Sequence, residues 1–207
     1  VGPYLRDRTR QHRLGLRSLA ADLPDSVADV EALEELLSRP PQALIDDLAA
    51  LDGDIIILGV GGKVGPCLAR MAKRAVPGKR IVGVARFSDR EVRRRLDAWG
   101  VETIACDLLD RGSVSQLPKL PNVIYMAGKK FGTTGGEPFT WAMNAHVPAL
   151  VGEAFAASRI VAFSTLCIYP FTDVTGPLCH EDTAPAPVGE YANSCVARER
   201  MFQYFSK

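Results

Sequence analysis

Residues 54–65 read Asp54-Ile55-Ile56-Ile57-Leu58-Gly59-Val60-Gly61-Gly62-Lys63-Val64-Gly65, an apolar run that opens directly onto a cluster of glycines. The run has the length and β-branched bias of a buried parallel strand, and residues 66–75 have helical spacing. Glycines at such a junction let the chain turn sharply and let a pyrophosphate approach the amides at the helix N-terminus. The stretch therefore predicts a dinucleotide-binding turn in a parallel sheet.

The glycines follow the wider spacing Gly59-x-x-Gly62-x-x-Gly65. The commoner G-x-G-x-x-G fingerprint would need glycine at Val64. The alternative is a glycine-rich loop that only packs a helix against a strand, but the position between strand and helix favours a cofactor site. The turn residues predicted to bind the cofactor are Gly59, Gly62, Lys63, Val64 and Gly65.

Composition narrows the class of protein. The chain has 207 residues, of which 47% are hydrophobic, so one main globular domain is expected. A net charge of +1 gives no electrostatic reason to expect nucleic acid or a membrane as a partner. No apolar run approaches the roughly 18 residues that span a bilayer, and the first residues lack a signal-peptide core. We expect a cytoplasmic protein.

Five cysteines, an odd number, are spread along the chain without a C-x-x-C pair. This pattern fits reduced thiols better than a disulfide framework or a zinc site. The three histidines have no metal-ligand spacing with the cysteines, so no metal site is predicted.

The chain divides into two parts by pattern. Residues 1–51 look helical: Ser26 is a candidate N-cap for a helix that reaches Ser38, and Pro40-Pro41 opens a second short helix through Leu51. We predict a helical N-terminal extension over residues 1–51 and a Rossmann domain over residues 52–207.

From residue 54 onward, strand and helix patterns alternate, which predicts an α/β fold with a doubly wound parallel sheet. The expected strands are 55–58, 80–85, 101–106, 122–126 and 160–163, and the expected helices are 66–75, 89–99, 139–157 and 190–206. No sixth strand or further domain follows the last helix, so we expect a five-stranded Rossmann domain that lacks a C-terminal substrate lobe.

The second expected strand ends at Val84-Ala85-Arg86-Phe87-Ser88, where Rossmann domains bind the adenosine ribose. An acidic residue there would accept hydrogen bonds from a 2′-hydroxyl, whereas Arg86 with Ser88 suits a 2′-phosphate. NADP is therefore the preferred cofactor and NAD the alternative. A surface arginine with no such role stays open.

Two further strand ends carry candidate cofactor contacts. Asp107 and Leu108 follow the third strand, where an aspartate can meet the adenine edge, although a solvated turn aspartate is an equal alternative. Ala127 and Gly128 follow the fourth strand, where small residues permit close approach to the cofactor.

Over residues 54–207 the pattern resembles the extended short-chain dehydrogenase/reductase family, of NAD-dependent epimerase/dehydratase type. The resemblance rests on ordered motifs: the glycine turn, Asp107, Tyr125-Met126-Ala127-Gly128, Asn144, the 163–169 segment FSTLCIY and Tyr191 in 191–195 YANSC. It implies an enzyme that transfers a hydride on a nucleotide-sugar or a similar hydroxyl or carbonyl substrate. A homodimer stays open as the assembly.

The resemblance also implies roles for individual residues. Thr165, with Ser164 beside it, would bind the reacting oxygen of the substrate, and Tyr191 would be the acid/base. Asn144 would contribute to the cofactor site. An aromatic residue that packs a helix on the sheet is the alternative for Tyr191.

The sequence departs from the family at one position. The family's Tyr-x-x-x-Lys motif places an ammonium on the helix face of the tyrosine, whereas this chain has Cys195. A tyrosine near its reference pKa of about 10 is a poor base at neutral pH, and a neutral thiol supplies no positive field. Arg198, one turn further on, or Lys129 and Lys130 would be substitutes, but weakened or altered catalysis is the favoured interpretation.

Three functions therefore remain open: an NAD(P)-dependent enzyme, a catalytically weakened dinucleotide-binding module that acts as sensor or scaffold, and the N-terminal part of a longer enzyme.

Overall fold

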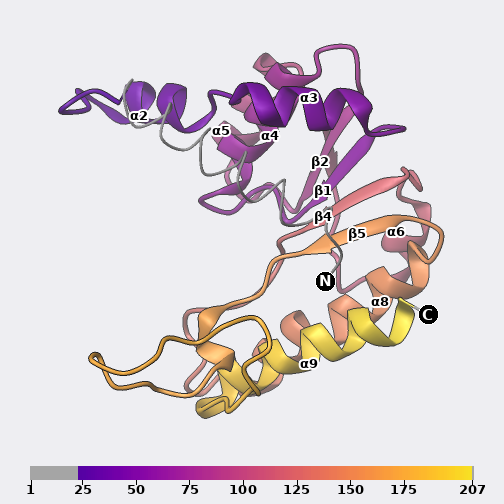
Figure 1. Ribbon diagram of the computed structural model, residues 1–207. Coiled ribbons are helices and arrows are strands. Elements are labelled where there is room, and N and C mark those ends of the chain that lie inside the picture. Colours follow the sequence, from indigo (N-terminus) through magenta and orange to yellow (C-terminus); the bar gives the residue numbers. More distant parts are fainter. Residues whose placement is uncertain (1–22, 207) are drawn as a thin grey trace.

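The computed structural model describes residues 23–206 and has five parallel strands in one sheet, in the order β3-β2-β1-β4-β5 (Figure 1). The strands are β1 Ile55–Leu58, β2 Ile81–Ala85, β3 Glu102–Ala105, β4 Asn122–Tyr125 and β5 Arg159–Ala162. Every neighbouring pair is parallel, and β1 pairs Ile55 with Ile81 of β2 and with Asn122 of β4. The predicted doubly wound parallel sheet is confirmed.

Helices cover both faces of this sheet (Figure 1). One layer holds α3 Gln42–Ala50, α4 Gly65–Ala75 and α5 Arg90–Ala98, and the other holds α6 Arg111–Gln116, α8 Val147–Ala154 and α9 Gly189–Phe205. Neither layer contains a helix, among residues 23–206, that is long and apolar enough to cross a membrane.

The side chains of β1 alternate between the two layers because successive residues of a strand point to opposite faces. Ile55 and Ile57 join the cluster under α4 and α5, whereas Ile56 and Leu58 join the cluster under α8. All four are buried, which explains why the strand reads as a continuous apolar run rather than an alternating one.

The N-terminal extension agrees with the prediction in part. α2 spans Val30–Leu37, and its N-cap is Asp29, whose carboxylate accepts from Ala32 N at 2.8 Å. The prediction that Ser26 caps this helix is therefore wrong. The second short helix, α3, begins after Pro41 as expected. Residues 1–22 of the predicted extension lie outside the described part of the chain.

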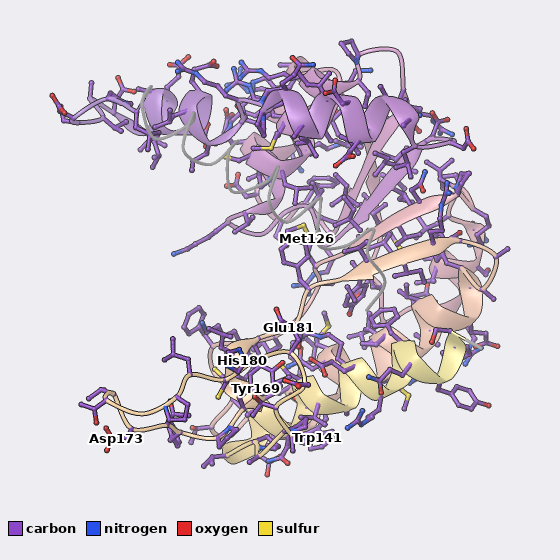
Figure 2. All side chains as sticks on the ribbon, in the orientation of Figure 1. Met126, Trp141, Tyr169, Asp173, His180 and Glu181 are labelled. Atoms are coloured by element: carbon purple, nitrogen blue, oxygen red, sulfur yellow. The ribbon has the colours of Figure 1, made fainter. Side chains whose placement is uncertain are left out.

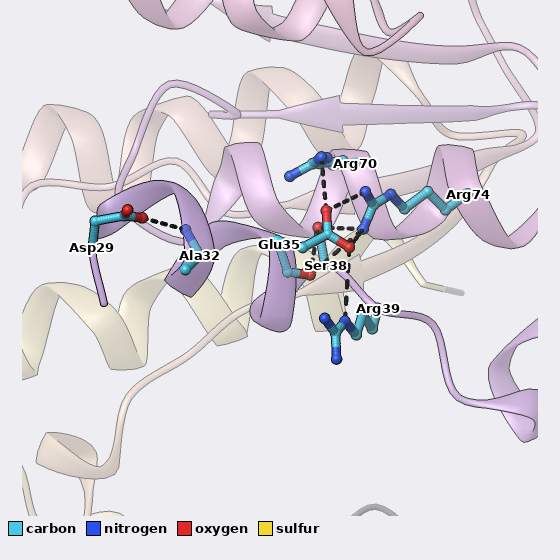
Figure 3. Close-up of polar contacts among 7 residues, drawn as sticks. All are labelled: Asp29, Ala32, Glu35, Ser38, Arg39, Arg70 and Arg74. Atoms are coloured by element: carbon cyan, nitrogen blue, oxygen red, sulfur yellow. Dashed lines mark hydrogen bonds and ion pairs between the residues drawn. The ribbon is translucent and has the colours of Figure 1, made fainter. Parts of the chain in front are cut away.

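Ion pairs hold α2 against α4 (Figure 3). The Glu35 carboxylate lies 2.9 Å from Arg70 and 2.5 Å from Arg74, and Ser38 Oγ accepts from Arg74 at 3.0 Å. From α3 and its C-cap, Leu48 and Leu51 pack on the core cluster under α4. α2 and α3 thus belong to the same helical layer as α4 and α5.

The single helix predicted over residues 139–157 is divided into three pieces. α7 spans Glu137–Trp141, a π-helical turn η1 spans Ala142–His146, and α8 follows. Pro148 has no N–H to donate to the carbonyl one turn before it, so the regular hydrogen-bond ladder is interrupted where η1 meets α8. This irregular turn carries Asn144.

The structure adds two short elements that the sequence pattern did not predict. α6 has only six residues and is capped by Asp110, whose side chain accepts from Gly112 N and Ser113 N at 3.1 and 3.2 Å. The 3-10 turn η2, Leu166–Ile168, is capped by Thr165. Such short elements are too brief to show periodicity.

Candidate functional site

The site lies at the carboxyl ends of the strands, where β1 separates β2 from β4. The chain leaves β1 toward β2 and β3 on one side, and β4 and β5 lie on the other. Ligands of open α/β sheets bind in the crevice at such a point, because the two crossovers diverge there. The glycine turn after β1 occupies this position.

The three glycines of the turn have different constraints. Gly59 has φ +94°, and a Cβ on it would lie 2.5 Å from Ala127 N; a Cβ on Gly65 would lie 2.1 Å from Val60 O. At Gly62 the nearest atom to a Cβ would be Gly59 O, at 3.8 Å. Gly59 and Gly65 are therefore required by the protein's own backbone, whereas Gly62 faces open space.

The N-terminus of α4 adjoins the same space. Its N-cap, Val64, makes no side-chain hydrogen bond to the first turn, and Lys63 and Val64 are exposed. Uncapped amides at a helix N-terminus, together with the helix dipole, favour an anion. An anion such as a pyrophosphate would suit this place, and the cofactor contacts of Lys63 and Val64 stay a prediction.

A cavity of about 380 Å³ extends from the glycine turn toward β2 and β3. The predicted residues Arg86, Asp107 and Leu108 line it. Phe87, which has φ +51°, and Met126 line it as well; both lie in the strand-end motifs, but neither was predicted to contact the cofactor. Their positions directly after β2 and β4 were the available signal.

A second cavity of about 330 Å³ extends from the same turn toward β5 and α9. Its lining brings together Lys63, Ser164, Tyr191 and Arg198, which are far apart in the sequence. Both cavities share the residues Gly59, Gly62, Met126, Ala127 and Gly128. The two hollows therefore form one groove across the strand ends, with the glycine turn at its middle.

Figure 2 shows Met126 beside the strand ends, with Tyr169, His180 and Glu181 on the segment that leads to α9. That segment, residues 169–188, contains no helix or strand. In the described part of the chain, no group of histidines, cysteines and carboxylates is arranged to hold a metal ion.

Tyr191 lies in the first turn of α9 and is partly buried. Burial raises the pKa of its phenol, while a hydrogen bond with Thr165 and the charge of Arg198 act in the opposite direction. The structure thus brings Tyr191 and Thr165 together, as predicted. The phenol is therefore protonated at neutral pH, and its raised pKa makes it a weaker acid than an ordinary tyrosine.

Cys195 has no exposed surface, and burial raises the pKa of its thiol above the usual range. The residue one turn after Tyr191 is therefore a neutral group at neutral pH. Ser164 lies on the exposed side of the site and donates a hydrogen bond to Glu199. Its hydroxyl is engaged by a carboxylate of α9, and Thr165, rather than Ser164, hydrogen-bonds with Tyr191.

Asn144 lies beneath the groove with no exposed surface. Its Oδ1 accepts from Lys129 N at 2.8 Å and from Arg198 at 2.8 Å, and its Nδ2 donates to Lys129 O at 2.8 Å and to Ser194 Oγ at 3.0 Å. Every polar position of this side chain is taken by protein. Asn144 therefore fixes the turn after β4 against α9, and its predicted contact with a cofactor stays a prediction.

Gly128 also has a protein neighbour that the sequence did not indicate. A Cβ at this position would lie 2.4 Å from Arg198 Nη2. The small residue after β4 is thus needed to admit the guanidinium, besides its position in the groove lining. Ala127 is buried and lies against Gly59.

Comparison with solved structures identifies the fold. The Bordetella bronchiseptica enzyme WbmG, solved in complex with NAD and UDP, is 23% identical with a TM-score of 0.61, over 74% of this chain and 50% of WbmG. MoeE5, solved with UDP-glucose and NAD, is 23% identical with a TM-score of 0.60, over 74% of this chain and 49% of MoeE5. A short-chain dehydrogenase/reductase superfamily protein from Agrobacterium tumefaciens with bound NAD is 18% identical, with a TM-score of 0.60 over 72% of this chain and 44% of its own length.

Neither a comparison with protein-family models nor a search of curated protein sequences finds a match. The chain shares the fold of these solved structures, which include a short-chain dehydrogenase/reductase superfamily protein, so the fold that the motifs predicted is confirmed. The chain spans about half the length of the solved structures that it matches.

Proposed function

We propose that this chain binds a nicotinamide dinucleotide along the groove and contributes to hydride transfer of the epimerase/dehydratase type. The observation that carries the proposal is the meeting of the two cavities at the glycine turn. A dinucleotide has two nucleoside halves joined by a pyrophosphate, and the groove has two hollows joined at an anion-binding helix N-terminus. Gly62 opens into the groove, which gives the pyrophosphate room to reach backbone amides.

The adenosine half belongs in the cavity beside β2 and β3. Arg86 is exposed there and Ser88 is close to it, which suits a 2′-phosphate and favours NADP. The nearby carboxylate of Asp89 accepts from Glu91 N at 2.9 Å as the cap of α5, so it is engaged in the protein. WbmG and MoeE5 were solved with NAD, which makes NAD the alternative.

The nicotinamide half belongs in the cavity beside Tyr191, where a bound cofactor would supply or accept the hydride. In the reducing direction, Tyr191 would donate its phenolic proton to the carbonyl oxygen of the substrate, and Thr165 would hold that oxygen. A nucleotide-sugar is the proposed substrate class, because MoeE5 was solved with UDP-glucose and with UDP-glucuronic acid, and WbmG with UDP.

A second function is favoured by one specific observation. Cys195 is buried and neutral beside Tyr191, so the site has no cation at that position of the helix. A dinucleotide sensor or scaffold would need the groove but not the acid/base chemistry. The third alternative, the N-terminal part of a longer enzyme, is favoured by the match to about half of each solved structure.

Three other features belong to the same proposal. They are a Rossmann domain over residues 52–207, a location in the cytoplasm, and assembly as a homodimer; light scattering would measure the assembly.

The test of this function is an incubation of the chain with NAD⁺ or NADP⁺ and a panel of UDP-sugars, in which oxidation of a sugar hydroxyl would reduce the cofactor and the absorbance of the reduced nicotinamide is followed over time. Turnover that is lost in Tyr191→Phe supports the enzyme. Binding of the dinucleotide without turnover supports the sensor or the partial enzyme. Absence of any binding contradicts the proposal as a whole.

A further inference from the structure

A buried cation on α9 lies next to the candidate acid/base. Arg198 is 6% exposed; its Nη1 donates to Phe163 O at 3.0 Å and its Nη2 to Asn144 Oδ1 at 2.8 Å. Its Nε is buried without a hydrogen-bond partner. Within residues 23–206, no carboxylate forms an ion pair with it. Its charge is therefore met only by neutral oxygens, and its field is left to act on its neighbours.

The helix places this charge on the face of α9 that carries Tyr191. Residues four and seven positions apart lie on one side of a helix, so Tyr191, Cys195 and Arg198 follow one another along the same face. Tyr191 and Arg198 line the same cavity of about 330 Å³. Cys195, between them, has no exposed surface and is a neutral thiol.

The electrostatics agree with this geometry. Burial is the largest influence on the pKa of Tyr191 and raises it, whereas Thr165 and Arg198 lower it and Cys195 raises it further. The same guanidinium lowers the pKa of Cys195 against the effect of burial. Arg198 is thus the one positive group among the influences on the Tyr191 phenol.

The other cations that line the cavity are oriented elsewhere. Lys129 Nζ lies 5.8 Å from the centre of the Phe139 ring, and Lys130 Nζ lies 5.5 Å from the centre of the Phe131 ring. Lys63 is exposed beside the glycine turn. None of them contributes to the shift in the pKa of Tyr191.

We propose that Arg198 is the positioning residue of the site: from one turn beyond Cys195, it supplies the positive charge beside Tyr191, fastens the end of β5 to α9, and holds the turn after β4 through Asn144. The inference rests on the proposed acid/base role of Tyr191. The positive charge that the Tyr-x-x-x-Lys motif would place at position 195 comes instead from position 198. It is carried by a guanidinium, which stays charged even when it is buried.

The position of Arg198 requires a residue without a side chain at position 128, and the sequence has glycine there. The guanidinium approaches the turn after β4 so closely that a Cβ at Gly128 would lie 2.4 Å from Nη2. Asn144, held by the π-helical turn, accepts from both Lys129 N and Arg198. Gly128, Asn144 and Arg198 therefore form one unit that sets the floor of the cavity under Tyr191.

The test is a titration of Tyr191 by NMR of protein labelled with ¹³Cζ-tyrosine, with the resonance assigned from the Tyr191→Phe spectrum. Arg198→Gln keeps hydrogen-bond donors but removes the charge, and Arg198→Lys keeps the charge. Arg200→Gln is the matched control, because Arg200 is exposed on α9 and bonds only to Gln203 in the described contacts.

In Arg198→Gln we expect the Tyr191 titration to move to higher pH, while Arg198→Lys and Arg200→Gln leave it near the wild-type position. Cys195→Lys added to Arg198→Gln should return it to lower pH, because the charge is restored one turn nearer. An unchanged titration in folded Arg198→Gln overturns the proposal. If that variant does not fold, Arg198→Met, which also removes the charge and keeps a long unbranched side chain, takes its place: a shift to higher pH supports the proposal, and an unchanged titration overturns it.

The titration needs no nucleotide, so it separates this inference from the proposed function. A shift in Arg198→Gln together with a failure of the wild type to bind NADH or NADPH would contradict the proposed function and leave the role of Arg198 intact. Dinucleotide binding by the wild type, together with an unshifted Tyr191 titration in Arg198→Gln, would support the proposed function and contradict the role of Arg198.

Discussion

The glycine-turn half of the molecule and the Tyr191 half differ in how exposed their large apolar side chains are. In the first half, formed by β1–β3 with α4 and α5, the strand and helix core is enclosed, and Leu58 and Leu96 are 0% exposed. In the second half, residues 166–188 leave Leu166, Phe171 and Val174 exposed by 83%, 92% and 96%. Asp173 marks the outer end of that segment, away from the sheet (Figure 2).

This difference indicates which part of the site is complete within this chain and which part needs additional protein surface. The side chains around the glycine turn are supported by a core on both faces of the sheet. The segment beside Tyr191 instead exposes several large apolar side chains, and such exposure is typical of a surface that is covered by further protein or by a ligand. We therefore expect cofactor binding to be a property of this chain, and substrate binding to need further surface.

The contrast predicts the largest effect on stability for a matched pair of leucines. Leu96 is fully enclosed on α5, and Leu178 is 73% exposed in the 169–188 segment. Leu96→Ala should lower the free energy of unfolding by about 2–5 kcal/mol, the range for a leucine deleted from a core. Leu178→Ala should change it by less than about 0.5 kcal/mol, as at other surface positions. Urea unfolding measures both, and equal losses would contradict the contrast.

The next effect concerns cofactor preference in the well-packed half. Arg86→Ala should weaken NADPH binding by about 1–3 kcal/mol, the range for a hydrogen bond to a charged group, and spare NADH. Arg90→Ala is the control, because Arg90 is exposed on α5 outside the cavity lining. Calorimetry gives both affinities. Tighter binding of NADH than of NADPH by the wild type would show that the preference for NADP is wrong.

The smallest effect concerns the attachment of α2. Hydrogen bonds and ion pairs with Arg74, and the nearby charges of Arg70 and Arg39, lower the pKa of Glu35 from its usual 4.5 (Figure 3). A lowered pKa means that the contribution to stability is present above pH 4.5 and is lost as the pH falls below it. Glu35→Gln should abolish this part of the pH dependence, with a small effect at neutral pH because the ion pairs are partly exposed to solvent.

Thermal unfolding between pH 3 and pH 7 would measure the effect. Glu31→Gln is the control, because Glu31 lies in the first turn of the same helix and has no ion pair among the described residues. Equal pH dependence in the wild type and Glu35→Gln would show that this cluster does not hold α2.

The sequence predicted the sheet because each strand carries its own signal. Ile55 to Leu58 are apolar on both faces, as a strand covered by helices on both sides must be, and the glycines after it mark the crossover. Helix starts were harder to predict: Ser26 and Asp29 are both good N-caps, and only the contact with Ala32 N distinguishes them.

The site was predicted less completely because its members meet only through the fold. The motifs and their order along the chain predicted that Gly62, Arg86 and Tyr191 belong to one site, and in the structure all three line the groove. It did not show that Asn144 is enclosed, nor that Arg198 contacts the turn at Gly128. Those facts depend on the π-helical turn and on the packing of α9, neither of which has a periodic signal in the sequence.

One measurement tests most directly the claim that the glycine turn binds a dinucleotide: calorimetric titration of NADH and NADPH into the wild type, Gly62→Val and Gly78→Val. A Cβ at Gly78 meets no atom within 4 Å, and one at Gly62 meets only Gly59 O at 3.8 Å, so both variants should fold. We predict that the wild type and Gly78→Val bind equally and that Gly62→Val does not bind, because its side chain occupies the place of the pyrophosphate. Equal binding by folded Gly62→Val would contradict the account.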